Sequence, residues 1–241
     1  MNTLKDKVIL VTGGAQGLGA AICKTLAEDQ ATVIAVDVKL EKLDKVVSEI
    51  KSMGGKAKAY QMDVCSEKSV EEVINRIILE FGKLDVVVNN AGVDHTKSIE
   101  ELTHAEFNQV IHVNLCGPFN VSKAAFTHMK NNRKGYIINI VSTAAKRAWA
   151  NASAYHASKW GLLGFSHALH VEARQHGIKV TALIAGGMQT PFILERFPDV
   201  NPNILQDPKN VAENVKYILY QQNGTVIPEM MVIPMTETSW P

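Results

Sequence analysis

The stretch that decides the fold is Val8-Ile9-Leu10-Val11-Thr12-Gly13-Gly14-Ala15-Gln16-Gly17-Leu18-Gly19. Its first four residues are apolar and largely β-branched, which indicates a strand covered on both faces. A glycine-rich turn follows directly, and the spacing of Ala20, Ile22 and Leu26 then indicates a helix. Glycines at such a turn let backbone N–H groups approach a pyrophosphate at the positive end of the helix. The spacing G-x-x-x-G-x-G differs from the common dinucleotide pattern, so a turn without a ligand is an open alternative.

An acidic residue ends the second predicted strand. Thr32 to Val36 has strand character, and Asp37 follows it, eighteen residues after Gly19. An acid at this distance can accept hydrogen bonds from the ribose hydroxyls of an adenosine, and it repels a 2′-phosphate. The alternative is that Asp37 caps the helix expected to begin near residue 40. With the glycine turn upstream, we favour the ribose role and NAD(H) over NADP(H), although the nearby Lys39 keeps NADP(H) as an alternative.

The rest of the chain alternates strands with helices. Further strands are predicted at 56–62, 84–88, 136–141, 178–183 and 230–233. Helices are predicted at 40–53, 66–81, 103–129 and 152–175 and after Asp207, with a long loop at 184–206. We find no linker or internal repeat, so residues 1–241 are expected to form a single doubly wound, Rossmann-type α/β domain. Its mostly parallel sheet has about seven strands with helices on both faces.

Several predicted helix ends carry local signals. Ser66 is a candidate N-cap, and Thr103 with Glu106 has the form of a capping box. Gly82 is a candidate helix stop. Asp207-Pro208 is typical of an N-cap followed by the first helical residue.

Polar motifs recur where the predicted strands end. Asp63-Val64 follows the third strand and is placed to meet an adenine edge, and Asn89-Asn90-Ala91-Gly92 follows the fourth. The second motif either lines a cofactor crevice or forms a local turn held by the asparagines. In doubly wound sheets ligands bind outside the carboxyl ends of the strands, so we expect these motifs to gather at one site.

Ser142 ends the fifth predicted strand, and Tyr155 and Lys159 follow it. Their four-residue spacing places the phenol and the ammonium on one face of a helix. A free tyrosine has a pKa of about 10, and a cation held beside it favours the phenolate. Tyr155 can then exchange a proton with a substrate hydroxyl or carbonyl oxygen that the Ser142 hydroxyl holds in place. The same pattern is also typical of an exposed tyrosine and lysine on a helix surface.

Asn114 lies within the apolar pattern of the 103–129 helix. A polar residue on such a face needs hydrogen-bond partners. It is therefore either a structural hydrogen-bonder or part of a polar network.

Composition excludes several classes of partner. The chain has 241 residues, 46% of them apolar, and a formal charge of +1. Its densest basic cluster, Lys130 with Arg133 and Lys134, is typical of a solvated helix end, so neither nucleic acid nor an anionic membrane is expected as a partner. Residues 1–7 lack the apolar core of a signal peptide, and no run approaches the roughly 18 apolar residues of a membrane span, so we expect a cytoplasmic protein.

The three cysteines and eight histidines do not suggest a metal site. Cys23, Cys65 and Cys116 are far apart in the chain, which favours buried, reduced thiols over a disulfide, a metal site or a nucleophile. The histidines form no metal-ligand pattern with an acidic partner, so no metal is expected.

Together these motifs resemble those of the short-chain dehydrogenase/reductase family along almost the whole chain. The matching residues, in order and spacing, are Thr12-Gly13-x3-Gly17-x-Gly19, Asn89-Asn90-Ala91-Gly92, Asn114, Ser142 and Tyr155-x3-Lys159. The resemblance implies an oxidoreductase that moves a hydride between a nicotinamide cofactor and a secondary alcohol or carbonyl substrate. Family members are usually dimers or tetramers, so a homodimer or homotetramer is expected.

The resemblance also implies the residue roles. Tyr155 would be the general acid/base, and Ser142 would orient the substrate oxygen. Lys159 would lower the pKa of Tyr155 and bind the nicotinamide ribose, while Asn114 would hold a water that links Lys159 to solvent. The residues expected to contact the cofactor are Gly13, Gln16, Gly17, Leu18, Gly19, Asp37, Asp63, Val64, Asn90, Ala91, Gly92, Tyr155, Lys159, Gly186, Met188 and Thr190.

The chain departs from the family pattern after the sixth strand, where Ala185 replaces the usual proline. Substrate specificity is expected in the loop at about 185–206 and around 144–150, with His95 and His156 as candidate contributors. The apolar loop residues are expected to close over the substrate and exclude water. The alternative to an enzyme is a non-catalytic NAD(P)-binding module that senses redox state or recruits a partner. The intact Asn-Ser-Tyr-Lys set favours the enzyme.

Overall fold

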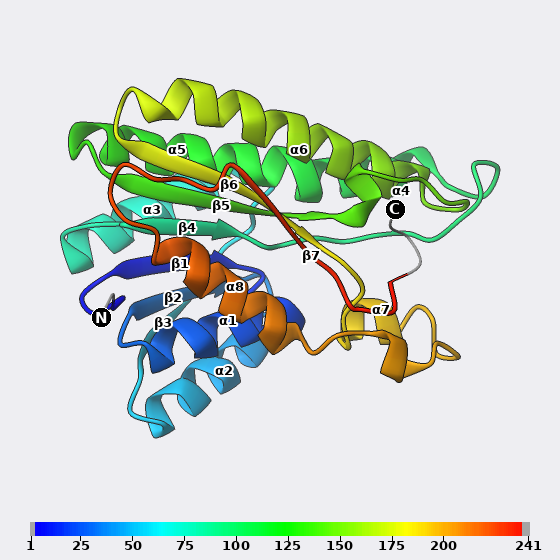
Figure 1. Ribbon diagram of the computed structural model, residues 1–241, viewed down its shortest axis with the longest axis horizontal. Coiled ribbons are helices and arrows are strands. Elements are labelled where there is room, and N and C mark those ends of the chain that lie inside the picture. Colours follow the sequence, from blue (N-terminus) through cyan, green and yellow to red (C-terminus); the bar gives the residue numbers. More distant parts are fainter. Residues whose placement is uncertain (1–2, 238–241) are drawn as a thin grey trace.

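The computed structural model describes residues 3–237. Seven strands form one sheet in the order β3-β2-β1-β4-β5-β6-β7, and every neighbouring pair is parallel (Figure 1). The doubly wound fold is confirmed, and the sheet is parallel throughout. The strands are β1 (Val8–Thr12), β2 (Thr32–Asp37), β3 (Lys56–Gln61), β4 (Val86–Asn89), β5 (Gly135–Ser142), β6 (Ile178–Ala185) and β7 (Glu229–Val232).

Helices cover both faces of the sheet (Figure 1). One face carries α1 (Gly17–Glu28), α2 (Leu40–Ser52) and α8 (Pro208–Leu219). The other carries α3 (Glu67–Phe81), α5 (Gly117–Asn131) and α6 (Ser153–Arg174), with α4 (His104–Ile111) packed beside α6. Among residues 3–237, no helix is both long and apolar enough to cross a membrane.

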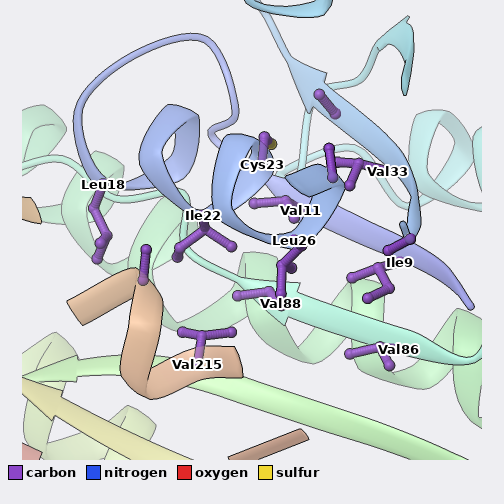
Figure 2. Packing of buried hydrophobic residues seen from close by; sticks show 14 of the residues in the cluster. Ile9, Val11, Leu18, Ile22, Cys23, Leu26, Val33, Val86, Val88 and Val215 are labelled. Atoms are coloured by element: carbon purple, nitrogen blue, oxygen red, sulfur yellow. The ribbon is translucent and has the colours of Figure 1, made fainter. Parts of the chain in front are cut away.

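The two apolar layers meet at β1. Ile9 and Val11 pack with Ile22 of α1 and Val215 of α8 on one face (Figure 2). Val8 and Leu10, which alternate with them, belong to the cluster on the opposite face. Successive strand residues point to opposite faces, which explains why a continuous apolar run was needed here.

The predicted helix caps are confirmed. The Ser66 side chain accepts a hydrogen bond from Ser69 N, and Thr103 and Glu106 form both bonds of the capping box. Asp207 accepts from Lys209 N, and the helix stop Gly82 has the left-handed conformation that favours glycine. These signals are local, so the sequence alone could place them.

The predicted helix 103–129 is interrupted. A π-helical turn, η1 (His112–Cys116), separates α4 from α5, and the buried Asn114 lies within it. Such turns are rare and often lie at functional sites. Apolar spacing did not reveal this turn, because the pattern continues on both sides of it.

The segment after β6 is more ordered than a long loop. β6 continues to Ala185, which pairs with Ser142 of β5 and Val232 of β7, so the loop begins two residues later than predicted. Two short helices follow, α7 (Pro191–Leu194) and the 3-10 helix η3 (Pro202–Ile204). Ala185, the departure from the family's proline, is thus an ordinary last residue of a central strand.

Candidate active site

One cavity of about 760 Å³ lies along the carboxyl ends of the strands. Most of its lining comes from the ends of β1 to β6 and the segments that follow them, as expected for a doubly wound sheet. Every residue predicted to contact the cofactor lines this cavity: Gly13, Gln16, Gly17, Leu18, Gly19, Asp37, Asp63, Val64, Asn90, Ala91, Gly92, Tyr155, Lys159, Gly186, Met188 and Thr190. Their individual roles stay predictions.

The glycine turn lies between β1 and the end of β4. Gly13 has φ +66°, and a Cβ there would lie 2.9 Å from Ala91 Cα, so only glycine fits. The Asn90 side chain donates to Thr12 O at 2.9 Å, and Thr12 Oγ1 accepts from the N–H groups of Asn90 and Ala91 at 3.0 Å. The asparagine motif therefore both lines the cavity and holds the local turn. The two interpretations of this motif, a cavity lining and a structural turn, are compatible.

The N-terminus of α1 is open toward an anion. Its N-cap residue, Gln16, makes no side-chain capping bond, and the first turn contains no acidic residue. The first N–H groups of a helix have no partner within the helix, and the helix dipole makes this end positive. The arrangement fits a pyrophosphate held by backbone N–H groups.

Asp37 lies at one end of the cavity, at the tip of β2. Its Oδ1 accepts from Lys39 N at 3.0 Å and its Oδ2 from Ala15 N at 3.4 Å. The N-cap of α2 is Lys39, so the alternative that Asp37 caps this helix is wrong. Two lysines belong to the same end of the cavity. Lys39 lines it, and Lys42 Nζ donates to Gln16 Oε1 at 3.1 Å.

Ser142, Tyr155 and Lys159 meet in the middle of the cavity. Ser142 is the last residue of β5, and the other two project from the start of α6. Lys159 Nζ lies 5.7 Å from the centre of the Tyr155 ring and donates to Ile140 O at 2.8 Å. Lys159 is buried and Tyr155 is half-buried at the cavity wall, so neither lies on an exposed helix surface. Desolvation favours their neutral forms, so it raises the pKa of Tyr155 and lowers that of Lys159.

In the protein without cofactor, the pKa of Tyr155 is set by groups other than Lys159, and the predicted effect of Lys159 on it stays a prediction. Desolvation by burial raises the pKa of Tyr155 to about 12, while a hydrogen bond with Ser142 opposes this. Asp94 raises the same pKa and Arg196 lowers it. Burial also lowers the pKa of Lys159 to about 8. The dominant cause at both groups is desolvation, which sequence spacing does not report.

Asn114 lies behind the cavity wall rather than in it. It is 1% exposed and is absent from the cavity lining. Its Oδ1 accepts from Val93 N at 2.8 Å, and its Nδ2 donates to Val93 O at 2.8 Å and to Ser158 Oγ at 3.1 Å. The structural interpretation of Asn114 therefore holds, and the predicted water relay stays a prediction.

The other end of the cavity is formed by the segment at 191–197. The Phe192 ring centre lies 5.8 Å from that of Tyr155, and the Arg196 guanidinium lies over the Phe192 ring at 3.9 Å. Arg196 also forms an ion pair with Asp94. Sequence reasoning missed this pair, because its members are 102 residues apart in the chain.

His156 supports the cavity wall without lining it. Its Nδ1 donates to Ala144 O at 2.8 Å, and Trp149 N donates to its Nε2 at 3.1 Å. The Trp149 ring lies against the imidazole, with ring centres 4.3 Å apart, and Trp149 lines the cavity. His156 therefore contacts the segment at 144–149 and does not itself line the cavity.

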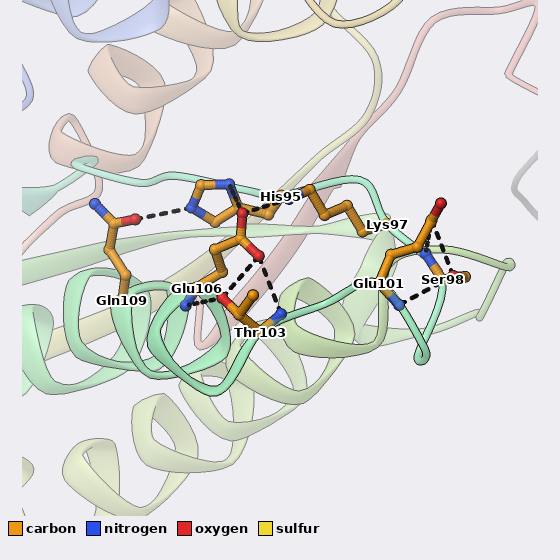
Figure 3. A network of polar contacts seen from close by, with 7 residues as sticks. All are labelled: His95, Lys97, Ser98, Glu101, Thr103, Glu106 and Gln109. Carbon is orange, nitrogen blue, oxygen red and sulfur yellow. Dashed lines mark hydrogen bonds and ion pairs between the residues drawn. The ribbon is translucent and has the colours of Figure 1, made fainter.

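His95 belongs to a polar network on the surface beside the cavity (Figure 3). Its Nε2 and Gln109 Oε1 are 2.8 Å apart, and Lys97 and Thr103 bind Glu106 beside it. A hydrogen bond from Lys97, with two more from Thr103, lowers the pKa of Glu106 to about 2. His95 is not part of the cavity lining, so it makes no direct contact there.

The sequence also did not indicate that Glu237 lies at the cavity. The chain returns after β7, and Glu237 Oε2 accepts from Gly187 N at 3.1 Å at the edge of the cavity. This contact joins residues that are 50 positions apart, so no sequence pattern points to it.

The cysteines are only partly as expected. All three are free thiols, but Cys23 is buried, Cys116 is half-buried and Cys65 is exposed, so the expectation of burial is wrong for Cys65. Burial raises the pKa of Cys23 to about 12. Within residues 3–237, no group of three or more histidine, cysteine or acidic side chains is placed to hold a metal ion.

Comparison with known proteins decides the family. The sequence model for short chain dehydrogenases matches residues 7–201. The chain belongs to the short-chain dehydrogenase/reductase family. Over 219 residues it is 35% identical to an uncharacterized oxidoreductase of Bacillus subtilis (strain 168), covering 91% of this chain and 85% of that protein.

Two further members of the family are informative. A 3-oxoacyl-[acyl-carrier-protein] reductase of Thermotoga maritima is 34% identical over 196 residues, covering 81% of this chain and 79% of that protein. The crystal structure of a metagenomic short-chain oxidoreductase in complex with NADP has a TM-score of 0.86 and 31% identity, covering 97% of this chain and all of that one. This short-chain dehydrogenase/reductase is thus an oxidoreductase with a nicotinamide-cofactor fold.

Proposed function

We propose that this protein transfers a hydride between a nicotinamide cofactor and a secondary alcohol or carbonyl substrate, with Tyr155 as general acid/base. The observation that carries the proposal is one cavity that joins the open N-terminus of α1 to Ser142, Tyr155 and Lys159. Such a cavity brings a pyrophosphate site and a proton-transfer group within the reach of one dinucleotide.

The residues present fit this cofactor. The glycine turn and Asn90 leave backbone N–H groups open at α1, and Asp37 offers carboxylate oxygens at the adenosine end. Lys159 would hold the nicotinamide ribose, with Thr190 and the Met188 backbone near the carboxamide. A bound nicotinamide would supply the hydride acceptor or donor and, when oxidised, a positive charge that favours the Tyr155 phenolate.

Tyr155 and Ser142 supply the proton chemistry. In reduction, the Tyr155 phenol gives its proton to the carbonyl oxygen as the carbon receives a hydride, and in oxidation the phenolate takes the hydroxyl proton. The Ser142 hydroxyl, which bonds to Tyr155, holds the reacting oxygen. Because burial raises the pKa of Tyr155 to about 12, the phenol is the resting form at neutral pH.

We retain NAD(H) as the preferred cofactor, because Asp37 would repel a 2′-phosphate. NADP(H) is the second candidate, favoured by Lys39 and Lys42 and by the NADP complex of the metagenomic relative. Asp37→Ser should lower kcat/KM for NADH about tenfold and raise it for NADPH, measured by initial rates with each cofactor. A wild-type protein with higher kcat/KM for NADPH than for NADH would contradict the assignment to Asp37.

The reaction class is tested by NADH fluorescence with NAD and a panel of secondary alcohols, polyols and hydroxy acids, run in parallel with NADP. Turnover supports an enzyme. Tight cofactor binding without turnover across the panel would favour the alternative, a non-catalytic redox-sensing or interaction module.

We further propose that residues 185–206 select the substrate and that the protein is a cytoplasmic homodimer or homotetramer. Phe119 of α5 and Trp160 and Val171 of α6 are about half exposed, which suits packing between copies. Analytical ultracentrifugation should give a dimer or tetramer, and Trp160→Asp should shift it toward the monomer. A wild-type monomer at micromolar concentration would contradict this assignment.

A further inference from the structure

The substrate end of the cavity contains a partly buried ion pair. Arg196 Nη1 bonds to Asp94 Oδ2, and the two side chains are 21% and 6% exposed. Thr96 Oγ1 also donates to Asp94 Oδ2, at 3.3 Å. Asp94 Oδ1 is buried and has no donor among the described residues, so Arg196 is the charge that compensates this carboxylate.

Arg196 is held by contacts that leave it little freedom. Its Nε donates to Phe192 O at 2.6 Å, and its guanidinium lies on the Phe192 ring, which faces Tyr155. Guanidinium groups bind carboxylates through two donors in a fixed plane. Here Nη1 is directed at Asp94 and Nε at the Phe192 backbone, both belonging to this chain.

Among the described residues that line the cavity, Arg196 is the basic side chain that lies beside Asp94. Three basic side chains line the cavity in residues 3–237, and Lys39 is at the Asp37 end. Lys159 donates to Ile140 O beneath Tyr155. The cavity lining also contains the apolar side chains of Val93, Trp149 and Phe192.

We propose that Asp94 makes this site selective for uncharged substrates by occupying Arg196, so that hydroxy and keto acids are rejected. A carboxylate placed beside Tyr155 would meet the Asp94 charge and find Arg196 already paired, and its desolvation would remain uncompensated. A neutral secondary alcohol or ketone carries no such penalty. This inference rests on the proposed function and names its substrate class.

The test compares two ketones of equal size that differ in charge, acetoacetamide and acetoacetate. Wild type should reduce the amide with kcat/KM at least about tenfold above the acid. Asp94→Asn frees Arg196 and should raise the acid-to-amide ratio about tenfold to a hundredfold. Arg196→Gln should lower the acid-to-amide ratio or leave it as low as in wild type. If the variants acted only by disordering the segment, Asp94→Asn and Arg196→Gln would change the ratio in the same direction.

Asp44→Asn is the matched control. Asp44 is exposed on α2, outside both the cavity lining and the segment at 185–206, so the variant changes the net charge equally without touching the pair. Its acid-to-amide ratio should equal that of wild type. A wild-type preference for acetoacetate, or a ratio that does not change in Asp94→Asn, would overturn the proposal.

A binding readout separates this inference from the proposed function. Tyr155→Phe loaded with NADH or NADPH should bind acetoacetamide more tightly than acetoacetate, as followed by quenching of the cofactor fluorescence. Adding Asp94→Asn should reverse that order even if neither ketone is turned over. Equal affinities, or no measurable affinity for the amide, would overturn the selectivity, whereas absent turnover alone would count only against the reaction class.

Discussion

Asn114 binds the backbone of Val93 through both ends of its side-chain amide, with Val93 N donating to Oδ1 and Nδ2 donating to Val93 O, each at 2.8 Å. Val93 follows the Asn90-Ala91-Gly92 turn and precedes Asp94. The π-helical turn thus fixes the segment that carries both the cavity-lining backbone of residues 90–92 and the Asp94 carboxylate.

Removing the two hydrogen bonds between Asn114 and Val93 should lower both stability and activity. Asn114→Ala leaves Val93 N and O without their side-chain partner and removes the donor to Ser158 Oγ, which still donates to Tyr155 O. The free energy of unfolding should therefore fall by about 2–4 kcal/mol. Urea unfolding measures it, and kcat/KM should fall with it. Asn108→Ala, at an exposed position of α4, should stay within about 0.5 kcal/mol of wild type. Equal stability of the two variants would show that the hydrogen bonds of Asn114 contribute nothing to the free energy of unfolding.

The buried Lys159 ammonium should lower the stability of the native protein at neutral pH. Burial lowers its pKa from 10.5 to about 8, so at pH 7 the native state holds a desolvated charge worth up to about 3 kcal/mol. Between pH 8 and 10.5 the unfolded chain binds the additional proton, so this cost disappears as pH rises. Lys159→Met should therefore be more stable than wild type at pH 7, and the difference should shrink toward pH 10.5.

The measurement is urea unfolding of the cofactor-free protein at pH 7 and pH 10. Lys123→Met, with a side chain 62% exposed on α5, is the control and should change little at either pH. A Lys159→Met variant that is less stable at pH 7, or a difference independent of pH, would be inconsistent with a desolvated ammonium. Turnover should be lost in Lys159→Met, so stability and activity should change in opposite directions.

His156 should affect the substrate through Trp149. His156→Leu removes the acceptor of Trp149 N and the donor to Ala144 O, which should destabilise the protein by about 1–3 kcal/mol. Because Trp149 lines the cavity, the KM for substrate should rise several-fold while the KM for cofactor stays the same. His104→Leu, at an exposed position of α4, should alter neither constant. Unchanged substrate KM in His156→Leu would show that the segment is held by other contacts.

Much of the fold could be predicted because its signals are local. The β1 run, the Ser66 and Thr103 caps and the Gly82 stop depend on residues within one turn of the chain. The gathering of strand-end motifs followed from parallel topology, which brings carboxyl ends to one edge.

What could not be predicted depends on packing between distant segments. Asp94 and Arg196 are 102 residues apart, and neither belongs to a recognisable pattern. The π-helical turn at Asn114 is stabilised by Val93 and Ser158, not by its own spacing. The desolvation that raises the pKa of Tyr155 and lowers that of Lys159 could not be predicted either, because spacing places the two groups on one helix face but does not report how they are packed.

The central claim is that Tyr155 moves the substrate proton, and replacing it with Phe tests this most directly. Tyr155→Phe keeps the ring that faces Phe192 but removes the hydroxyl, and Tyr217→Phe removes an exposed one from α8 as the control. We expect Tyr155→Phe to bind cofactor like wild type and lose about 10²–10⁴-fold in kcat, with Tyr217→Phe unchanged. Full turnover in Tyr155→Phe would contradict the account.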